Sequence, residues 1–106
     1  MTRMPTKQLT ARNFLESLRG EPLSFGRMIE SIRLADEVTQ VDLARKMEMS
    51  RAHLCDIEKG RRPVRPERAA RFAKELGYSV NQLVAVAVED ELRKAGLQVR
   101  VRLDAA

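Results

Sequence analysis

The sequence predicts an all-α fold, and two observations support this prediction. Apolar residues recur at spacings of three and four along five segments between residues 24 and 96, as on helices with one buried face. These segments begin at residue types that cap helices or at a proline, and most of them end at a glycine. The chain has 106 residues, 43% of them hydrophobic, which is enough for one domain with a modest core.

The first predicted elements lie in the N-terminal quarter of the chain. Thr10 is a suitable N-cap for a short extra helix that ends at Leu18. Ser24 is the N-cap of the first helix of the main domain. We therefore expect an N-terminal tail with a short helix over residues 1–22 and one helical domain over residues 23–96.

Local sequence also predicts where the other four helices begin and end. The predicted starts are Thr39, Ser50, Pro66 and Ser79, and the predicted stops include Gly60, Gly77 and Gly96. Asp42 stands three residues after Thr39, which is close to a capping box, and Ser79 with Gln82 is a capping-box pair. The last helix carries a wide apolar stripe, and Val86 lies off it, which predicts apolar surface beyond what one core needs.

The C-terminal segment changes its hydrophobic period. Apolar Leu97, Val99, Val101 and Leu103 alternate with polar residues, which is typical of a β-strand. Because a lone strand is not stable, we expect residues 97–106 to pair with the same segment of a second chain and to mediate dimerisation. The alternatives are a frayed tail or capture of the strand by another protein.

The excess positive charge is concentrated in one short segment. Residues 51–74 contain eight basic and three acidic residues, a balance of +5, and the rest of the chain has twelve of each. The whole net charge of +5 therefore lies in this segment, as expected of a surface that faces phosphates. The alternative is a solvated basic face without a partner.

Several other functions find little support in the composition. One cysteine and one histidine exclude a disulfide framework and an intrachain zinc finger, and we expect no metal or other cofactor. We see no glycine-rich phosphate loop and no nucleophile beside the histidine, so we expect no enzyme. No apolar run has transmembrane length and the N-terminus lacks the apolar stretch of a signal peptide, so we expect a cytoplasmic protein with no membrane partner.

The segment from Gln40 to Lys59 predicts a DNA-binding motif. Two helices of about eight residues are joined by a turn of about three, residues 47–49. In a helix-turn-helix the first helix holds the second rigidly, so that the outer face of the second can enter a DNA groove. The outward residues of the second helix are Arg51, Ala52, His53, Cys55 and Asp56.

Residues 39–63, TQVDLARKMEMSRAHLCDIEKGRRP, resemble the lambda-repressor/Cro class of helix-turn-helix proteins, the XRE family. The resemblance rests on TQ-x-x-LA, the I-E-x-G ending and the later LGYS, and it covers about residues 24–83. It implies a five-helix lambda-repressor-like domain that binds double-stranded DNA sequence-specifically as a transcriptional repressor. One departure is Glu48, because the family usually has a glycine at this often left-handed turn position.

The resemblance also implies roles for individual residues. Gln40 matches a residue that binds a phosphate, residues 60–62 match a segment near the DNA backbone, and Glu58 matches an acid in an internal ion pair. Residues that match Arg51, Ala52 and Asp56 face bases in the family. The predicted DNA-contacting residues are Gln40, Ser50, Arg51, Ala52, His53, Asp56, Lys59, Arg61 and Arg62.

Alternatives remain open for several of these side chains. Arg51 suits a bidentate contact with guanine, or else a phosphate contact. Asp56 either accepts from cytosine or orients Arg51 or Lys59. His53 is within reach of a base or a phosphate. On the following helix, Arg65, Arg68 and Arg71 form one ridge that either tracks phosphate or solvates the helix.

The expected assembly is a homodimer on a palindromic operator, because one helix-turn-helix covers only a few base pairs. A HigA-like antitoxin is the alternative, since small XRE proteins often resemble antitoxins that repress their own operon and neutralise a ribonuclease toxin. The chain length, the extra N-terminal helix and the C-terminal strand would fit such a partner. A purely structural interaction module is a third possibility, and it would show no salt-sensitive DNA binding.

Overall fold

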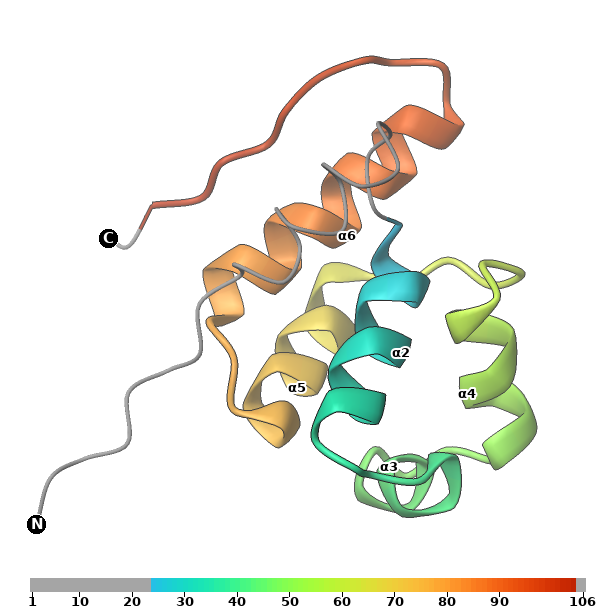
Figure 1. Ribbon diagram of the computed structural model, residues 1–106. Coiled ribbons are helices and arrows are strands. Elements are labelled where there is room, and N and C mark those ends of the chain that lie inside the picture. Colours follow the sequence, from blue (N-terminus) through green and yellow to red (C-terminus); the bar gives the residue numbers. More distant parts are fainter. Residues whose placement is uncertain (1–23, 105–106) are drawn as a thin grey trace, which may run out of the picture.

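The computed structural model of the protein describes residues 24–104, and within this range the chain forms five helices (Figure 1). The helices are α2 (Phe25–Ala35), α3 (Gln40–Lys46), α4 (Arg51–Glu58), α5 (Pro66–Leu76) and α6 (Val80–Lys94). This confirms the all-α prediction for residues 24–96. The predicted helix from Thr10 to Leu18 and the remainder of residues 1–22 lie outside the described residues.

The helices begin at the predicted residues because side chains bind the free N–H groups there. The hydroxyls of Ser24, Thr39, Ser50 and Ser79 each accept a hydrogen bond from the backbone N–H three residues later, at 3.0–3.3 Å. Pro66 occupies the first turn of α5. The predicted capping box of α6 is wrong in its second half, because Gln82 Oε1 accepts no hydrogen bond from the described residues.

All five helices end with the chain turning through a left-handed residue. The N–H group that follows this residue donates to the carbonyl five positions earlier, at 2.8–2.9 Å. Three of the left-handed residues are glycines, but the turns after α2 and α3 pass through Glu37 (φ 57°) and Glu48 (φ 56°). A side chain with a Cβ is disfavoured there by roughly 1–2 kcal/mol. The left-handed turn expected at Glu48 is therefore confirmed.

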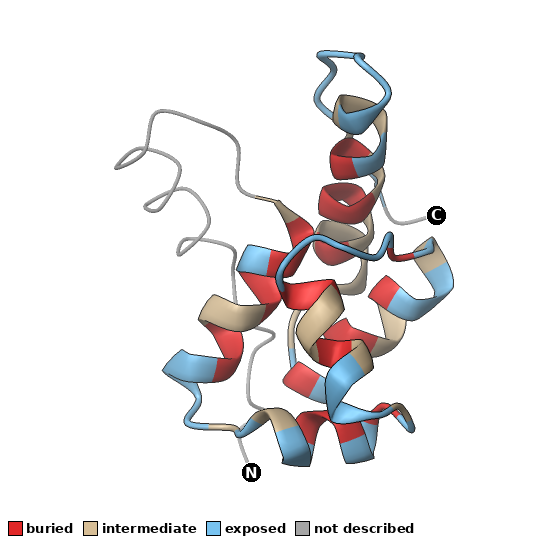
Figure 2. Cartoon of the chain, turned by 90° about the vertical axis from the view of Figure 1, so that its right-hand side faces the viewer, coloured by how far each residue is buried: buried red, intermediate tan, exposed pale blue. Residues whose placement is uncertain are grey.

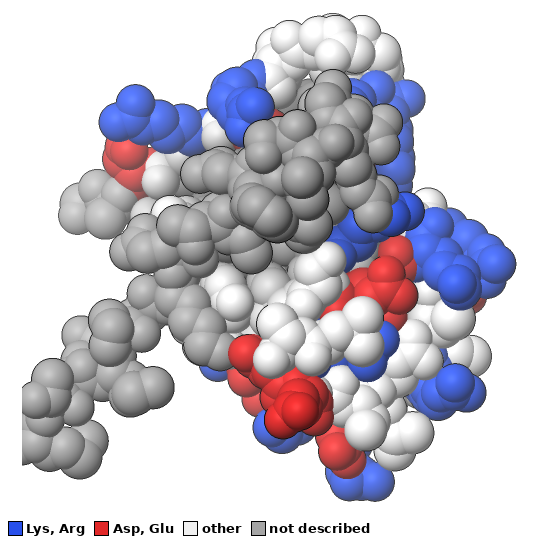
Figure 3. Space-filling view, viewed as in Figure 1, with Lys and Arg blue, Asp and Glu red and all other residues white. Residues whose placement is uncertain are grey.

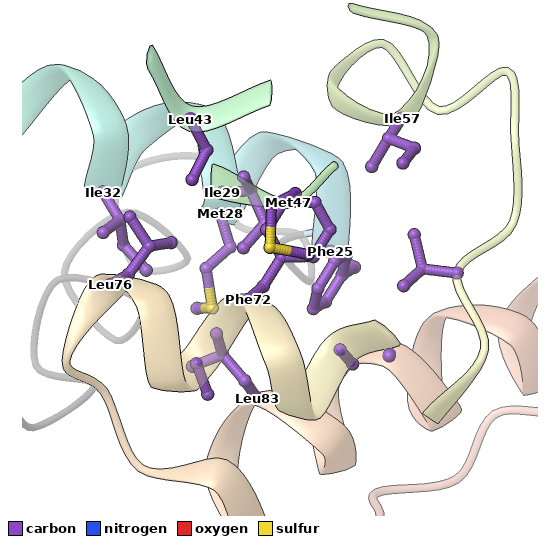
Figure 4. Close-up of a cluster of buried hydrophobic side chains, with 14 of the residues drawn as sticks. Phe25, Met28, Ile29, Ile32, Leu43, Met47, Ile57, Phe72, Leu76 and Leu83 are labelled. Atoms are coloured by element: carbon purple, nitrogen blue, oxygen red, sulfur yellow. The ribbon is translucent and has the colours of Figure 1, made fainter. Parts of the chain in front are cut away.

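One hydrophobic core joins the five helices. α2 packs against α4, α5 and α6, and α3 packs against α4. Figure 4 shows side chains from α2 and its neighbours pointing toward one another, and the rings of Phe25 and Phe72 meet edge to face with centroids 5.8 Å apart. Inner helix faces are buried and outer faces exposed (Figure 2). Val86 is only 1% exposed and belongs to this core, so it does not provide the surplus apolar surface that the periodicity predicted.

The C-terminal strand prediction is wrong for the described chain. Residues 97–104 have no regular secondary structure, and none of residues 24–104 forms a β-strand. The segment turns back over α6 (Figure 1), with Arg100 Nε 3.7 Å from Glu89 Oε1. A strand needs the backbone of a neighbouring strand to bind its N–H and C=O groups, and residues 24–104 provide none. The alternating apolar residues Leu97, Val99 and Leu103 remain 51%, 51% and 41% exposed.

None of the described helices is long and apolar enough to cross a membrane.

The start of α2 packs closely against the end of α4. A Cβ on Gly26 would overlap the carbonyl oxygen of Ile57 and would lie 2.8 Å from that of Glu58. From α6, Asp90 Oδ2 accepts a hydrogen bond from the N–H of Phe25, at 3.3 Å, and so binds the N-terminus of α2. The missing side chain of Gly26 therefore sets the distance between α2 and α4.

We predict that Gly26→Ala lowers the free energy of unfolding by about 2–3 kcal/mol, because two backbone carbonyls must move to admit the methyl group. Gly96→Ala is the control: its Cβ would meet no atom within 4 Å, so only the left-handed backbone costs about 1 kcal/mol. Urea denaturation followed by circular dichroism measures both. A Gly26→Ala variant no less stable than Gly96→Ala would show that this contact does not limit the packing.

Candidate nucleic-acid interface

The helix pair α3–α4 presents one exposed helix face on a buried support. On α4, the side chains of Leu54 and Ile57 are buried in the core, whereas Arg51 and Ala52 in its first turn are exposed. His53, Cys55 and Asp56 are half-buried along the same helix. The predicted division of α4 into an inner and an outer face is therefore present.

A buried ion pair fixes the far end of α4. Arg33 Nε lies 2.7 Å from Glu58 Oε2, and Arg33 Nη2 donates to Glu58 Oε1 at 3.1 Å, a bidentate arrangement. The two side chains are 9% and 1% exposed. The hydrogen bond that Arg33 donates to Glu58 raises the pKa of Arg33 further above its ordinary value, so Arg33 stays charged although it is buried. The internal ion pair expected of Glu58 is confirmed.

Arg33 is a functional residue that the sequence analysis missed. It stands four residues after Ile29 and eight after Phe25, so it lies on the buried face of α2, where a charge needs a partner. Its Nη1 also donates to the carbonyl of Val38, at 3.0 Å, in the loop before α3. A single charged residue on the apolar side of a helix was the available signal.

Gln40 belongs to the same buried network. Its Nε2 donates to Glu58 Oε1 at 2.9 Å, which joins the first residue of α3 to the last residue of α4. One amide hydrogen is used in this bond, and the second remains for another acceptor. The network thus holds the Gln40 amide at the N-terminus of α3, where the resemblance implies a phosphate.

Asp56 has cationic partners, although not the expected ones. Its Oδ1 lies 3.3 Å from Arg61 Nη1 and its Oδ2 lies 3.7 Å from Arg62 Nε. The expectation that Asp56 orients Arg51 or Lys59 is therefore not met. Asp56 instead connects α4 to the loop that follows it.

His53 lies against α5. Arg68 Nη1 is 3.1 Å from His53 Nε2, and because arginine can only donate, this nitrogen accepts and the ring is neutral. Burial lowers the pKa of His53, and the positive charges of Arg68 and Arg62 lower it further. The contact joins the outer part of α4 to the helix behind it.

The predicted arginine ridge of α5 divides into separate contacts. Arg65 Nε lies 3.6 Å from Glu67 Oε2, Arg68 contacts His53, and Arg71 Nη2 lies 2.7 Å from Glu48 Oε1. The three arginines line one open groove with Met47 and Glu48. Two of them therefore connect α5 to the helix pair.

Basic side chains gather along the edge that carries α4 and the loop after it (Figure 3). Lys59, Arg61 and Arg62 are exposed there. Glu58, one of the three acids of residues 51–74, is buried against Arg33 from outside that segment. Arg71 of the same segment is likewise paired with Glu48 from outside it, so the two pairs leave the excess positive charge of this segment unchanged. Residues 24–104 contain no group of three or more His, Cys, Asp or Glu that is arranged to hold a metal ion.

We predict that Glu58→Gln lowers the free energy of unfolding by about 3–5 kcal/mol, because Arg33 stays buried without a counter-ion. Glu67→Gln is the matched control, since it removes the same charge from an exposed pair, and we expect a loss of about 1 kcal/mol or less. Thermal and urea unfolding give both values. Equal losses in the two variants would contradict a structural role for the buried pair.

We also predict that the imidazole of His53 titrates with a midpoint below its ordinary value of about 6.5. His53 is the sole histidine of the chain, so its ring resonances in a proton NMR titration are unambiguous. Arg68→Met should raise the midpoint part of the way back, because burial remains, and Arg102→Met should leave it unchanged. A midpoint at or above 6.5 in the unsubstituted protein would refute the assigned contact.

Comparison with known proteins gives one family assignment. A protein-family model described as Helix-turn-helix (HTH_3) matches residues 29–83, slightly more than half of the 106 residues, and spans α3 and α4. Comparison with curated proteins found no match. Comparison with solved structures found no match either. The family match and the exposed face of α4 lead to the same conclusion: the chain belongs to the HTH_3 family of helix-turn-helix proteins, DNA-binding transcription regulators of the Cro/lambda-repressor type.

Proposed function

We propose that the protein is a transcriptional repressor that binds a specific double-stranded DNA sequence by placing α4 in the major groove. The observation that carries this proposal is the position of Arg51 and Ala52, which are exposed on a helix anchored by Leu54 and Ile57. An anchored helix loses little freedom on binding, so its side chains can distinguish base edges. We propose a binding role and no catalysis.

Arg51 is the proposed base-reading residue. It is the first residue of α4 and fully outside the core, where a guanidinium can donate to O6 and N7 of guanine. Ala52 follows it and would contact the methyl group of thymine. Asp56 is already bound to Arg61 and Arg62, which favours an orienting role over a contact with cytosine.

The proposed phosphate contacts lie at both ends of the helix pair. Lys59, Arg61 and Arg62 form the exposed basic end of α4 and its loop. The Gln40 amide, which Glu58 holds at the start of α3, is a proposed contact to the DNA backbone. Ser50 and His53, near the start of α4, are the remaining proposed phosphate contacts. Phosphate contacts position a protein on DNA, whereas base contacts provide specificity.

We further propose a homodimer on a palindromic operator. α4 has eight residues and reaches only a few base pairs, so two copies about 34 Å apart are needed for strong discrimination. The C-terminal third supplies the proposed contact surface, because the segment after α6 exposes Leu97, Val99 and Leu103 to solvent. A second chain that covers these side chains would remove apolar surface from water.

The same exposed segment favours one alternative, an antitoxin that represses its own operon and also neutralises a ribonuclease toxin. Leu97, Val99 and Leu103 would then contact the toxin instead of a second copy. A neighbouring reading frame that arrests growth, and whose effect this chain relieves, would favour the antitoxin. The repressor proposal predicts no such rescue.

We predict that Arg51→Ala relaxes the preference at one base pair of each half-site by about 1–3 kcal/mol. Arg61→Ala should weaken binding to all DNA sequences similarly. It should also reduce the slope of log K against log salt by about 1, because one phosphate contact is lost. Binding titrations of both variants on an operator and on single-base variants of it measure these effects. If Arg51→Ala weakens every sequence equally, Arg51 does not read a base.

We predict that a chain ending at residue 96 shifts toward monomer in sedimentation equilibrium and loses its preference for a palindrome, because it lacks Leu97, Val99 and Leu103. A chain that lacks only residues 105–106 keeps these side chains and serves as the control. A full dimer with unchanged operator affinity after removal of residues 97–106 would exclude this segment as the dimer contact.

A further inference from the structure

We propose that Arg71 on α5 is a positioning residue for α4: it stabilises the left-handed turn between α3 and α4 and thereby sets the orientation in which α4 meets DNA. The inference rests on the proposed function, because it concerns how the same helix is presented. Arg71 lies outside the helix pair α3–α4 and is not part of the proposed base-reading face.

The turn has a built-in conformational cost. Glu48 is left-handed at φ 56°, so that the N–H of Met49 can donate to the carbonyl of Ala44, at 2.9 Å, and end α3. α4 begins three residues after Glu48. A shift in the backbone angles at Glu48 would therefore change the direction of α4 directly.

Arg71 contacts this turn at two points. Its Nη2 donates to the carbonyl of Lys46 at 3.0 Å and to Glu48 Oε1 at 2.7 Å. Lys46 is the last residue of α3, and its carbonyl is among those that have no partner within the helix. The guanidinium thus binds an end carbonyl of α3 and the side chain of the left-handed residue together, which favours the observed turn.

The turn after α2 also lacks a glycine, and there too an arginine binds a backbone carbonyl. This turn passes through left-handed Glu37 (φ 57°), and there Arg33 donates to the carbonyl of Val38, at 3.0 Å. In both turns an arginine from the protein interior or from a neighbouring helix binds a backbone carbonyl of the turn. The repetition indicates that these arginines offset the cost that glycine would avoid.

The same contacts leave Arg71 fewer donors and less unbalanced charge for a phosphate. Both hydrogens of its Nη2 are used, its charge is balanced by Glu48, and the side chain is 41% exposed. Glu48 balances the charge of Arg71 one to one. By contrast, Arg61 and Arg62 share the single carboxylate of Asp56 and keep a net positive charge. Arg71 should therefore contribute little to the salt dependence of affinity, unlike Arg61. A positioning role and a phosphate role therefore predict different measurements.

The test compares Arg71→Met with Lys74→Met, which removes the same charge from an exposed position one turn further along α5. Affinities for a selected duplex and for a random duplex are measured over a range of salt concentrations. We expect Arg71→Met to lower the affinity for the selected duplex about three- to fivefold, with an unchanged salt slope and an unchanged affinity for the random duplex. Lys74→Met should leave the ratio of the two affinities unchanged.

Glu48→Gly provides a rescue, because glycine adopts the left-handed turn without support. In the Glu48→Gly background, Arg71→Met should change the selected-duplex affinity by less than about twofold. A salt slope reduced by about 0.9 with equal weakening of both duplexes would show that Arg71 binds phosphate. No difference between Arg71→Met and Lys74→Met would equally overturn the proposal.

Amide hydrogen exchange at Met49 gives a readout that needs no DNA. Arg71→Met should accelerate exchange of this N–H, which bonds to Ala44, and the acceleration should disappear in the Glu48→Gly background. Absence of duplex binding by the unsubstituted protein would refute the proposed function, while exchange would still decide whether Arg71 stabilises the turn. Unchanged exchange in Arg71→Met would refute the positioning role by itself.

Discussion

The buried ion pair between Arg33 and Glu58 is the constraint on which the arrangement of α2, α3 and α4 depends. It joins α2 to the C-terminal end of α4, and the hydrogen bond from Gln40 to Glu58 extends it to the start of α3. Removing two charges from water is costly, and the bidentate geometry with two further hydrogen bonds offsets that cost. Such a pair selects one arrangement of helices more than it adds stability, which suits a protein that must hold a reading face in place.

The two ends of α4 are held by different means. At its C-terminal end, Gly26 lets α2 approach the carbonyls of Ile57 and Glu58, so backbone packing and the ion pair act together. At its N-terminal end, the turn through Glu48 sets the direction of the helix. The face between these ends stays exposed, and the basic residues lie around it (Figure 3). Fixed ends with an unbound outer face are what direct reading of a DNA groove requires.

The accuracy of the sequence-based predictions follows the range of the interactions involved. Helix starts at Ser24, Thr39, Ser50 and Ser79 were predictable because a cap depends on residues within one turn of the chain. Periodicity identified the inner face of α4, and the family resemblance implied the internal role of Glu58. Neither identifies the partner of a charged side chain, so Arg33 was missed and Asp56 was given the wrong cations. The C-terminal strand failed for a related reason, since alternation describes one strand and not the neighbour that a strand needs. The DNA-contacting residues remain predictions.

Selection of bound sequences from a random duplex pool, at a stated salt concentration, tests whether α4 reads bases from a fixed support. We predict strong enrichment of an inverted repeat whose half-sites are centred about 10–10.5 base pairs apart, or a multiple of this spacing, because two copies of α4 face the same side of the duplex. The protein with Arg51→Ala should select the same spacing with one position in each half-site relaxed. Recovery of sequences no different from the starting pool would show that α4 does not read bases.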